Sequence, residues 1–356
     1  MINKTITSFA LTFVVSVSLL MANAEASEGK KFAKLADEIW QYRLQQSPLT
    51  ANYYGLDTVP DQMPDLSPAA LKEEYETTLR QLQKLDKIKQ RKLSEQERIN
   101  LAVLRHRLQN IADQYQFQAY QVPITAEGGF HTSLGFLPGS TKFSTEQDYK
   151  HYLSRLSKFP GFFEQQIQYM RQGLKSGNSQ PKVVLKGFEQ SIDGYLVQDV
   201  SKNPFFRPFG TKPDFLSEET FSALKDNAKR VIQNAVMPSY QAFRDFMTME
   251  YIPGARPTIG VKATPNGEAF YANRAKHYTT TDLTPEQIHQ LGLAEVKRIR
   301  GEMRTIIEEV GFDGSFSDFL HFLRTDPQFY AKTAEELLMR AAYLSKKMDA
   351  QLPKLF

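Results

Sequence analysis

Residues 251–296 read YIPGARPTIGVKATPNGEAFYANRAKHYTTTDLTPEQIHQLGLAEV, and they interrupt a chain that otherwise has the apolar spacing of helices. Two short segments in this stretch, residues 259–263 (IGVKA) and 268–273 (EAFYAN), carry Val, Phe and Tyr and flank the turn sequence TPNG at residues 264–267. Proline presets the second turn position, and Asn and Gly tolerate a positive φ angle. We therefore expect a small β-hairpin here.

The residues after the expected hairpin have the features of a helix N-terminus. Thr284 can serve as the N-cap, Pro285 suits the first helical position, and Gln287 is placed to return the capping-box hydrogen bond. A helix is therefore predicted to begin after Thr284. A capped helix that follows a hairpin is ordinary architecture, so these features alone do not indicate a function.

The first residues have the pattern of an export signal. A short polar head with Lys4 precedes an apolar run over residues 9–21, and Ala22 and Ala24 supply the small residues of a cleavage site. The alternative is an uncleaved N-terminal anchor, but the apolar run is short for a membrane-spanning helix. We expect residues 1–24 to be a signal peptide and the mature chain to be periplasmic or secreted, without membrane association after cleavage.

The composition predicts a globular chain that folds without disulfides. The 356 residues include no cysteine, and 41% of them are hydrophobic, which is ample for a buried core. The 44 basic and 40 acidic side chains are spread along the sequence and give a net charge of only +4. This balance does not indicate nucleic-acid binding, so no partner of that class is expected.

The rest of the chain has the spacing of helices. Apolar residues recur at helical intervals from Phe32 to Leu44, and Ser67-Pro68 opens another helical stretch. No repeat or low-complexity linker divides the sequence, so we expect residues 25–356 to form a single, mainly α domain, a multi-helix array with one small β-hairpin. Further helix starts are predicted at Ser94, Ser217, Ser315 and Thr333, and a kink at Pro238.

The motifs of the common catalytic sites are missing from the sequence. There is no thiol nucleophile, and neither a G-x-S-x-G elbow nor a phosphate-binding glycine loop occurs. The six histidines include no pair in an H-E-x-x-H arrangement, so no zinc-binding helix of that kind is predicted. The sequence therefore offers no catalytic residue and no metal ligand, and no cofactor is expected in this chain.

A few residues in the opening stretch are open to a binding role. Arg256, at the entry to the expected hairpin, could meet a carboxylate ligand or pair with a structural Asp or Glu. His289, one turn into the predicted helix, could donate a proton or contact substrate, or it could pack on a helix surface, and packing is the commoner role. Phe270 and Tyr271 would project from opposite faces of a strand, one toward the core and one toward solvent or a cleft.

Several segments together resemble a known family. They are SPLTANYYGLD (residues 47–57), GGFHTSLGFLP (128–138), YLSRLSKFPGFFEQQIQYMRQGLKSG (152–177) and the stretch over residues 251–338. These segments are similar to the bacterial domain-of-unknown-function family 885, whose members resemble zinc peptidases of the gluzincin type. The resemblance implies a mostly helical fold around a deep cleft, with a hairpin near the metal.

The resemblance also implies a substrate-binding edge. In peptidases of that general kind, an edge strand holds an extended peptide by main-chain hydrogen bonds. The residues expected to bind substrate are then those of the candidate edge, Gly267, Glu268, Ala269, Phe270 and Tyr271. Arg256 and His289 are two further candidates.

The zinc signature of the family, His-Glu-x-x-Pro-Gly-His-His, lies on the C-terminal side of the matched region, and this sequence ends at Phe356 without it. We therefore expect the N-terminal portion of an exported zinc-peptidase-like protein, truncated before the metal-binding half. It would supply one cleft wall and the substrate-edge hairpin for a peptide substrate, and it would be inactive alone, with zinc only in the full-length protein. The alternative is a non-catalytic helical protein that binds peptides or a separately encoded C-terminal half.

Overall fold

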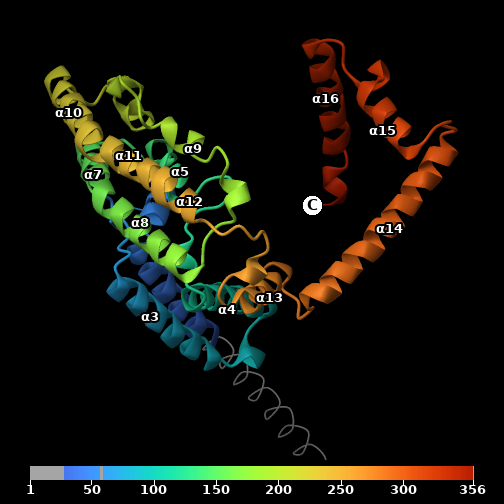
Figure 1. Ribbon diagram of the computed structural model, residues 1–356, viewed down its shortest axis with the longest axis horizontal. Coiled ribbons are helices and arrows are strands. Elements are labelled where there is room, and N and C mark those ends of the chain that lie inside the picture. Colours follow the sequence, from blue (N-terminus) through green and yellow to red (C-terminus); the bar gives the residue numbers. More distant parts are fainter. Residues whose placement is uncertain (1–27, 57–58, 356) are drawn as a thin grey trace, which may run out of the picture. The chain divides into compact units, whose positions relative to one another are not determined.

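The computed structural model describes residues 28–56 and 59–355, and these residues are mainly α-helical (Figure 1). The expected mainly α fold is therefore confirmed. The contacts divide the chain into two compact units, the first ending at Thr281 and the second beginning at Asp282. The expected signal peptide, residues 1–24, lies outside the described residues, and a single domain over residues 25–356 stays a prediction.

Three long helical segments pack together in the N-terminal part of the first unit. They are residues 28–46, α3 (Pro68–Asp86) and α4 (Glu95–Gln116). The capping box predicted at Ser94 is confirmed, because the Ser94 N–H donates to the Glu97 carboxylate over 2.8 Å and the Glu97 N–H donates to the Ser94 hydroxyl over 3.3 Å. The buried side chains between these helices form a small apolar core that includes Phe32, Leu35, Ile39, Leu82, Leu85, Leu101 and Leu108.

A larger, aromatic core fills the rest of the first unit. Four helices enclose it (Figure 1), α7 (Glu146–Ser157), α8 (Phe159–Ser176), α10 (Glu218–Val231) and α11 (Met237–Phe246). Its rings meet mostly edge to face or tilted, the arrangements that aromatic quadrupoles favour. The buried hydroxyls are paired, since Tyr152 donates to the Phe205 carbonyl and Tyr240 to the His131 carbonyl.

The helix that contains Pro238 is not broken. A π-helical turn, Ile232–Val236, precedes the proline, and a second one, Met247–Tyr251, joins α11 to α12 (Ile252–Gly254). Proline has no N–H to donate, and a wider turn accommodates that missing hydrogen bond without ending the helix.

The predicted β-hairpin is wrong. Residues 259–263 contain only a short 3-10 turn, η8 (Val261–Ala263), and the expected second strand, residues 268–273, lies inside α13 (Gly267–Thr279). The segment EAFYAN looks strand-like when taken alone, but it continues with Arg, Ala and Lys, which favour a helix. Over the 13 residues of α13 this preference outweighs the β preference of Phe270 and Tyr271.

The turn between the two segments does form, but it leads into a helix. The Gly267 N–H donates to the Thr264 carbonyl over 2.9 Å, and Asn266 adopts a φ angle of 54°. Glycine is required at position 267 because a Cβ atom there would lie 2.0 Å from the Val261 carbonyl oxygen. The predicted turn at residues 264–267 therefore forms, and the prediction is wrong only for the element that follows it.

The second unit consists of α14 (Pro285–Glu309), α15 (Phe316–Thr325) and α16 (Ala334–Asp349), with the short turns η9 (Pro327–Phe329) and η10 (Leu352–Lys354). The predicted cap at Thr284 is confirmed, since its hydroxyl accepts from the Gln287 N–H over 3.2 Å. Among the described residues of this unit, Ile307 is the only buried apolar side chain. Its helices therefore leave most of their apolar side chains uncovered.

β-pairing within the described residues is limited to two isolated bridges, Ile124 with Gly129 and Pro181 with Arg256. No described helix combines the length and the hydropathy that a membrane span needs. Short elements connect the helices of the first unit. They are α2 (Pro48–Tyr53), η1 (Gln90–Lys92), η2 (Ala119–Gln121), α5 (Phe130–Leu134), α6 (Leu137–Ser140), η3 (Lys182–Leu185), α9 (Gln190–Asp193), η4 (Val200–Lys202) and η5 (Pro204–Phe209).

Candidate functional site

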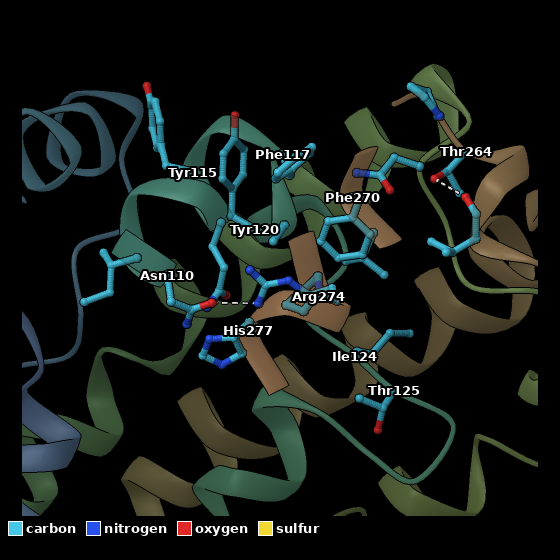
Figure 2. A pocket seen from close by; sticks show the side chains of 18 of the residues that line it. Asn110, Tyr115, Phe117, Tyr120, Ile124, Thr125, Thr264, Phe270, Arg274 and His277 are labelled. Carbon is cyan, nitrogen blue, oxygen red and sulfur yellow. Dashed lines mark hydrogen bonds between the residues drawn. The ribbon is translucent and has the colours of Figure 1, made fainter. Parts of the chain in front are cut away.

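A cavity of about 750 Å³ lies in the first unit, within the size range of small-ligand sites (Figure 2). Its lining comes from α3, α4, η2 and α13, together with the segments at residues 122–125, 178–180 and 261–265. Segments far apart in the sequence therefore build one site. The side chains that bear on its chemistry are Arg43, Glu74, Tyr75, Asn110, Tyr115, Phe117, Tyr120, Arg256, Phe270, Arg274 and His277.

Aromatic rings form one wall of the cavity. Tyr75 and Tyr115 stack with their ring centroids 4.5 Å apart, and Tyr120 lies 5.9 Å from Tyr115. Phe117 and Phe270 meet edge to face at 5.5 Å. Burial raises the pKa of the Tyr120 hydroxyl above its usual value, so this group stays neutral in the physiological range. The wall is thus apolar and uncharged, with phenol oxygens at its edge.

One face of α13 supplies the polar groups. Phe270, Asn273, Arg274 and His277 follow helical spacing, so they share one side of this helix. The Arg274 guanidinium donates to the Asn110 side-chain oxygen over 2.7 Å and also to the side-chain oxygen of Asn273, and it lies over the Phe270 ring at 5.6 Å (Figure 2). Burial lowers the pKa of Arg274, although a guanidinium stays charged at neutral pH.

The cavity-lining His277 stacks on a second histidine, His106, which is not part of the lining. The His106 and His277 rings are parallel within 2°, with centroids 4.7 Å apart, and the Nδ1 atom of His277 is buried without a hydrogen-bond partner in the described structure. Burial, then Arg274 and then His106 lower the pKa of His277. His277 therefore favours the neutral imidazole at physiological pH.

This histidine pair does not suit a metal ion. Rings stacked face to face direct their nitrogen lone pairs along parallel planes, whereas a zinc ion needs lone pairs that converge on one point. Among residues 28–56 and 59–355, no group of three or more His, Asp or Glu side chains is placed to hold a metal. The zinc of the peptidase resemblance therefore finds no fitting donor set in the described residues.

Positive charge exceeds negative charge in the cavity lining. The lining contains the guanidinium groups of Arg43, Arg256 and Arg274 but a single carboxylate, that of Glu74. Glu74 forms an ion pair with Arg43 and so balances one of the three. The remaining charge favours an anionic ligand over a cationic one.

Within the described residues Arg256 pairs with main-chain carbonyls and with no Asp or Glu, and its contact with a carboxylate ligand stays a prediction. Its Nε donates to the Ser179 carbonyl over 2.7 Å, and its Nη1 donates to the carbonyls of Ile259 and Gly260 over 3.1 and 2.9 Å and also to that of Thr258. The guanidinium thus gathers the main chain of the loop at residues 258–260. This loop role leaves Nη2 with no hydrogen-bond partner among the described residues.

The other predicted site residues are scattered. Arg256 and Phe270 line the cavity, whereas Tyr271 is 53% exposed and is not part of the lining. The buried Gly267 shapes the turn, and the Glu268 carboxylate forms an exposed ion pair with Lys262 at 2.6 Å. The remaining two candidates, Ala269 and His289, are exposed, and His289 belongs to α14 of the second unit.

Sequence reasoning missed Asn110, Tyr115, Arg274 and His277. A signal for the α13 residues was present, because Phe270, Arg274 and His277 stand at intervals of four and three residues, which is the spacing of one helix face. The strand assignment concealed it. The α4 residues carried no comparable signal, since Asn110 lies 164 residues from its partner Arg274 along the chain.

Known proteins share this fold. The crystal structure of a "putative lipoprotein" from Colwellia psychrerythraea has a TM-score of 0.73 and 21% sequence identity, and the match covers 93% of this chain and 59% of that one. A "putative lipoprotein of unknown function" from Shewanella oneidensis has a TM-score of 0.55 and 16% identity, with 78% and 48% covered. The chain thus spans about half to three fifths of each of these structures. At such identities the likeness shows the fold alone.

The search of curated proteins found no match. A family model does match, under the description "Bacterial protein of unknown function (DUF885)", and it covers residues 48–356. That range is most of the chain and includes every element that lines the cavity except Arg43. The chain therefore belongs to the DUF885 family of bacterial proteins.

Proposed function

We propose that this chain is the N-terminal part of an exported, zinc-peptidase-like protein, that it supplies one wall of a peptide-binding cleft, and that it has no peptidase activity alone. The observation that carries the proposal is the cavity of about 750 Å³, with an aromatic wall and excess positive charge. Apolar surface with a few convergent polar groups is typical of sites that hold an extended or small ligand. The peptidase resemblance supplies the class of ligand.

Two results of the comparisons support the other parts of the proposal. The matched structures are described as those of lipoproteins, a class of exported proteins, which agrees with the expected signal peptide and a periplasmic or secreted location. This chain covers 59% of the Colwellia protein. A catalytic zinc would then belong to the part of the longer proteins that this sequence does not match.

The proposed mode of peptide contact differs from the one that a hairpin would give. Residues 267–271 are helical and not extended, so Gly267, Glu268, Ala269 and Tyr271 cannot serve as a strand edge. Phe270 and Arg274 instead present side chains to the cavity. Peptide selection would then come from an apolar pocket and charged groups, with little contribution from main-chain pairing.

The purified full chain is expected to bind peptides in the micromolar to millimolar range without cleaving them. Isothermal titration calorimetry measures the binding, mass spectrometry of the incubated peptides detects cleavage, and elemental analysis after dialysis against zinc measures the metal. Phe270→Ala should weaken binding about tenfold through lost ring contacts. Phe215→Ala is the matched control, since Phe215 is 49% exposed and lies outside the cavity lining.

Stoichiometric zinc together with peptide cleavage by the chain alone would contradict the proposal. Equal loss of binding in Phe270→Ala and Phe215→Ala would also count against the cavity, because the effect would then not be local. Circular dichroism of both variants separates lost binding from lost folding.

A second candidate function is a non-catalytic protein that binds a partner chain, and one observation favours it. The apolar side chains of α14 and α16 are largely exposed, and contiguous exposed apolar surface is typical of interaction sites. We propose that the occupant of this surface is a separately encoded C-terminal half, equivalent to the unmatched part of the longer structures. The exposed side chains are Leu291, Leu293, Val296, Ile299, Met303 and Ile306 on α14, and Leu337, Leu338, Met339, Tyr343, Leu344 and Met348 on α16.

The full chain expressed alone is therefore expected to self-associate. Analytical ultracentrifugation should show species larger than the monomer, and Leu338→Glu should shift the distribution toward monomer, because a charge on the apolar face opposes association. Lys347→Glu is the control on the same helix at a charged, exposed position. A monodisperse wild-type monomer that melts cooperatively would argue against an uncovered partner surface.

A further inference from the structure

We infer that Arg274 anchors the C-terminal carboxylate of a bound peptide and that the adjoining aromatic wall receives the last side chain. This inference rests on the proposed peptide binding and specifies it further. It assigns the cavity a ligand class, namely peptides with a free C-terminus that end in an apolar or aromatic residue. The argument follows from the partners of Arg274, the charges around it and the surface beside it.

Arg274 has unused hydrogen-bonding capacity. A guanidinium has five N–H donors. In the described structure, Nε and one N–H of Nη2 donate to Asn273, and one N–H of Nη1 donates to Asn110. One N–H on each terminal nitrogen is left, and two such groups suit a carboxylate, which accepts two parallel hydrogen bonds from arginine.

The charge of Arg274 is held by neutral groups. Both acceptors of its hydrogen bonds are amide oxygens, and the structure gives Arg274 no ion pair within residues 28–56 and 59–355. The acidic groups that act on it are the Tyr278 phenol and the carboxylate of Asp113, and Asp113 accepts a hydrogen bond from the Asn273 amide over 2.7 Å. A partly buried cation without a contacting anion is stabilised by an anionic ligand.

The two amides also fix the guanidinium in place. Asn110 on α4 (Figure 2) and Asn273 on α13 hold it from two helices, and the guanidinium stacks over the Phe270 ring. Asn273 is itself held by Asp113. A guanidinium oriented in this way loses little entropy when it binds a ligand, which is the arrangement of a preformed anion site.

Apolar surface adjoins the guanidinium. Phe270 packs edge to face on Phe117, and Tyr120 and Tyr115 continue the wall. The hydroxyls of Tyr115 and Tyr120 have no hydrogen-bond partner among the described residues, so they are available to the main chain of a ligand. A carboxylate on Arg274 would therefore place the neighbouring side chain against rings, and the preceding peptide groups near phenol oxygens.

The test compares the peptide Ala-Ala-Phe with its C-terminal amide on the full chain, by isothermal titration calorimetry. The free acid is expected to bind about tenfold more tightly than the amide, as for one charge-assisted bidentate contact. Arg274→Gln should abolish this difference, because the free acid and the amide then both meet a neutral side chain. Arg274→Lys should restore part of the preference, since an ammonium keeps the charge without the planar fork.

Arg107→Gln is the matched control, because Arg107 is an exposed arginine on α4 that does not line the cavity. It should retain the preference for the free acid. Equal binding of acid and amide to the wild-type chain would overturn the carboxylate anchor while leaving peptide binding intact. No binding of either peptide would overturn the proposed peptide binding and this inference with it. The wild-type comparison needs no variant, so the test stands even where a substitution impairs folding.

Discussion

Replacing Arg155 by methionine will lower the free energy of unfolding of the first unit by about 3 kcal/mol. The Arg155 side chain is 1% exposed. Its guanidinium donates to the Gln62 and Val59 carbonyls over 2.9 and 3.1 Å and to the Asn52 side-chain oxygen over 2.9 Å. Methionine fills similar volume but donates no hydrogen bond, so all three hydrogen bonds are lost. The Val59 carbonyl still accepts from the Gln62 N–H and the Asn52 oxygen from the Thr141 hydroxyl, whereas the Gln62 carbonyl keeps no donor among the described residues.

Two opposing effects set the size of this change. Three hydrogen bonds to a charged group would contribute roughly 6 kcal/mol if they added fully. Removal of the cation also removes the cost of keeping it away from water, and burial is what lowers the pKa of Arg155 to about 10. The lost hydrogen bonds outweigh the desolvation cost that is removed with the cation, because the oxygens that accepted them stay partly buried.

The consequence for the site is indirect. Arg155 is bonded to Asn52 of α2 and to the main chain at Val59 and Gln62, before α3 begins. Helix α3 in turn contributes Glu74 and Tyr75 to the cavity. Urea unfolding followed by fluorescence of Trp40, the only tryptophan in the sequence, measures the change in the first unit. Arg80→Met is the control at an exposed ion pair and should change stability by less than about 0.5 kcal/mol. A loss below about 1 kcal/mol for Arg155→Met would contradict the expectation.

The helix starts could be predicted because their signals are local. The capping boxes at Ser94 and Thr284 depend on residues three positions apart, and both form as the sequence indicates. Patterns of this kind need no knowledge of tertiary structure. They fix where a helix begins, but they do not say which of its faces meets another element.

The assignment of residues 268–273 failed because six residues were too short a window. Phe and Tyr prefer strands, yet the same residues continue into Arg274 and His277 at helical spacing. A turn before them was consistent with either element. The contact of α13 with α4, through Asn110 and Asp113, is a tertiary feature that local propensity does not contain.

The cavity could be predicted only in part for the same reason. Arg256 and Phe270 were named from the sequence and do line it, but the partners of Arg256 are main-chain carbonyls, which no residue pattern identifies. His289 was named with them, although it belongs to the other unit. Sites that several distant helices build become visible only when the helices are placed in space.

The second large effect concerns His131, which is fully buried on α5 among Phe130, Phe188 and Phe243. Its Nε2 lies 2.9 Å from the Ser191 hydroxyl oxygen, and that hydroxyl donates its own proton to the Phe188 carbonyl over 2.7 Å. Nε2 must therefore carry the hydrogen, and Nδ1 is an unprotonated atom with no partner in the described structure. A second proton would place a charge among aromatic rings.

Burial lowers the pKa of His131 from 6.5 to about 4. The unfolded chain then binds a proton between these two values while the folded chain does not, so stability is unaffected above pH 6.5 and falls as the pH drops toward 4. A shift of this size corresponds to about 3 kcal/mol at the low end of the window. The segment that precedes α5 lines the cavity through Ile124 and Thr125, so acid should loosen that wall first.

His131→Gln is expected to remove this part of the pH dependence, because the Gln amide can still donate to Ser191 but cannot be protonated there. Urea unfolding at pH 7 and at pH 4.5 measures it in the wild type and in the variant, and the wild type should lose about 2 to 3 kcal/mol more than the variant between the two. Carboxylates such as Asp61 and Glu250, whose pKa values are lowered in the fold, also lose stabilisation in acid, but they do so equally in both proteins. His289→Gln, at an exposed histidine, should keep the wild-type dependence. If His131→Gln and the wild type lose the same stability, protonation of His131 is not what destabilises the first unit in acid.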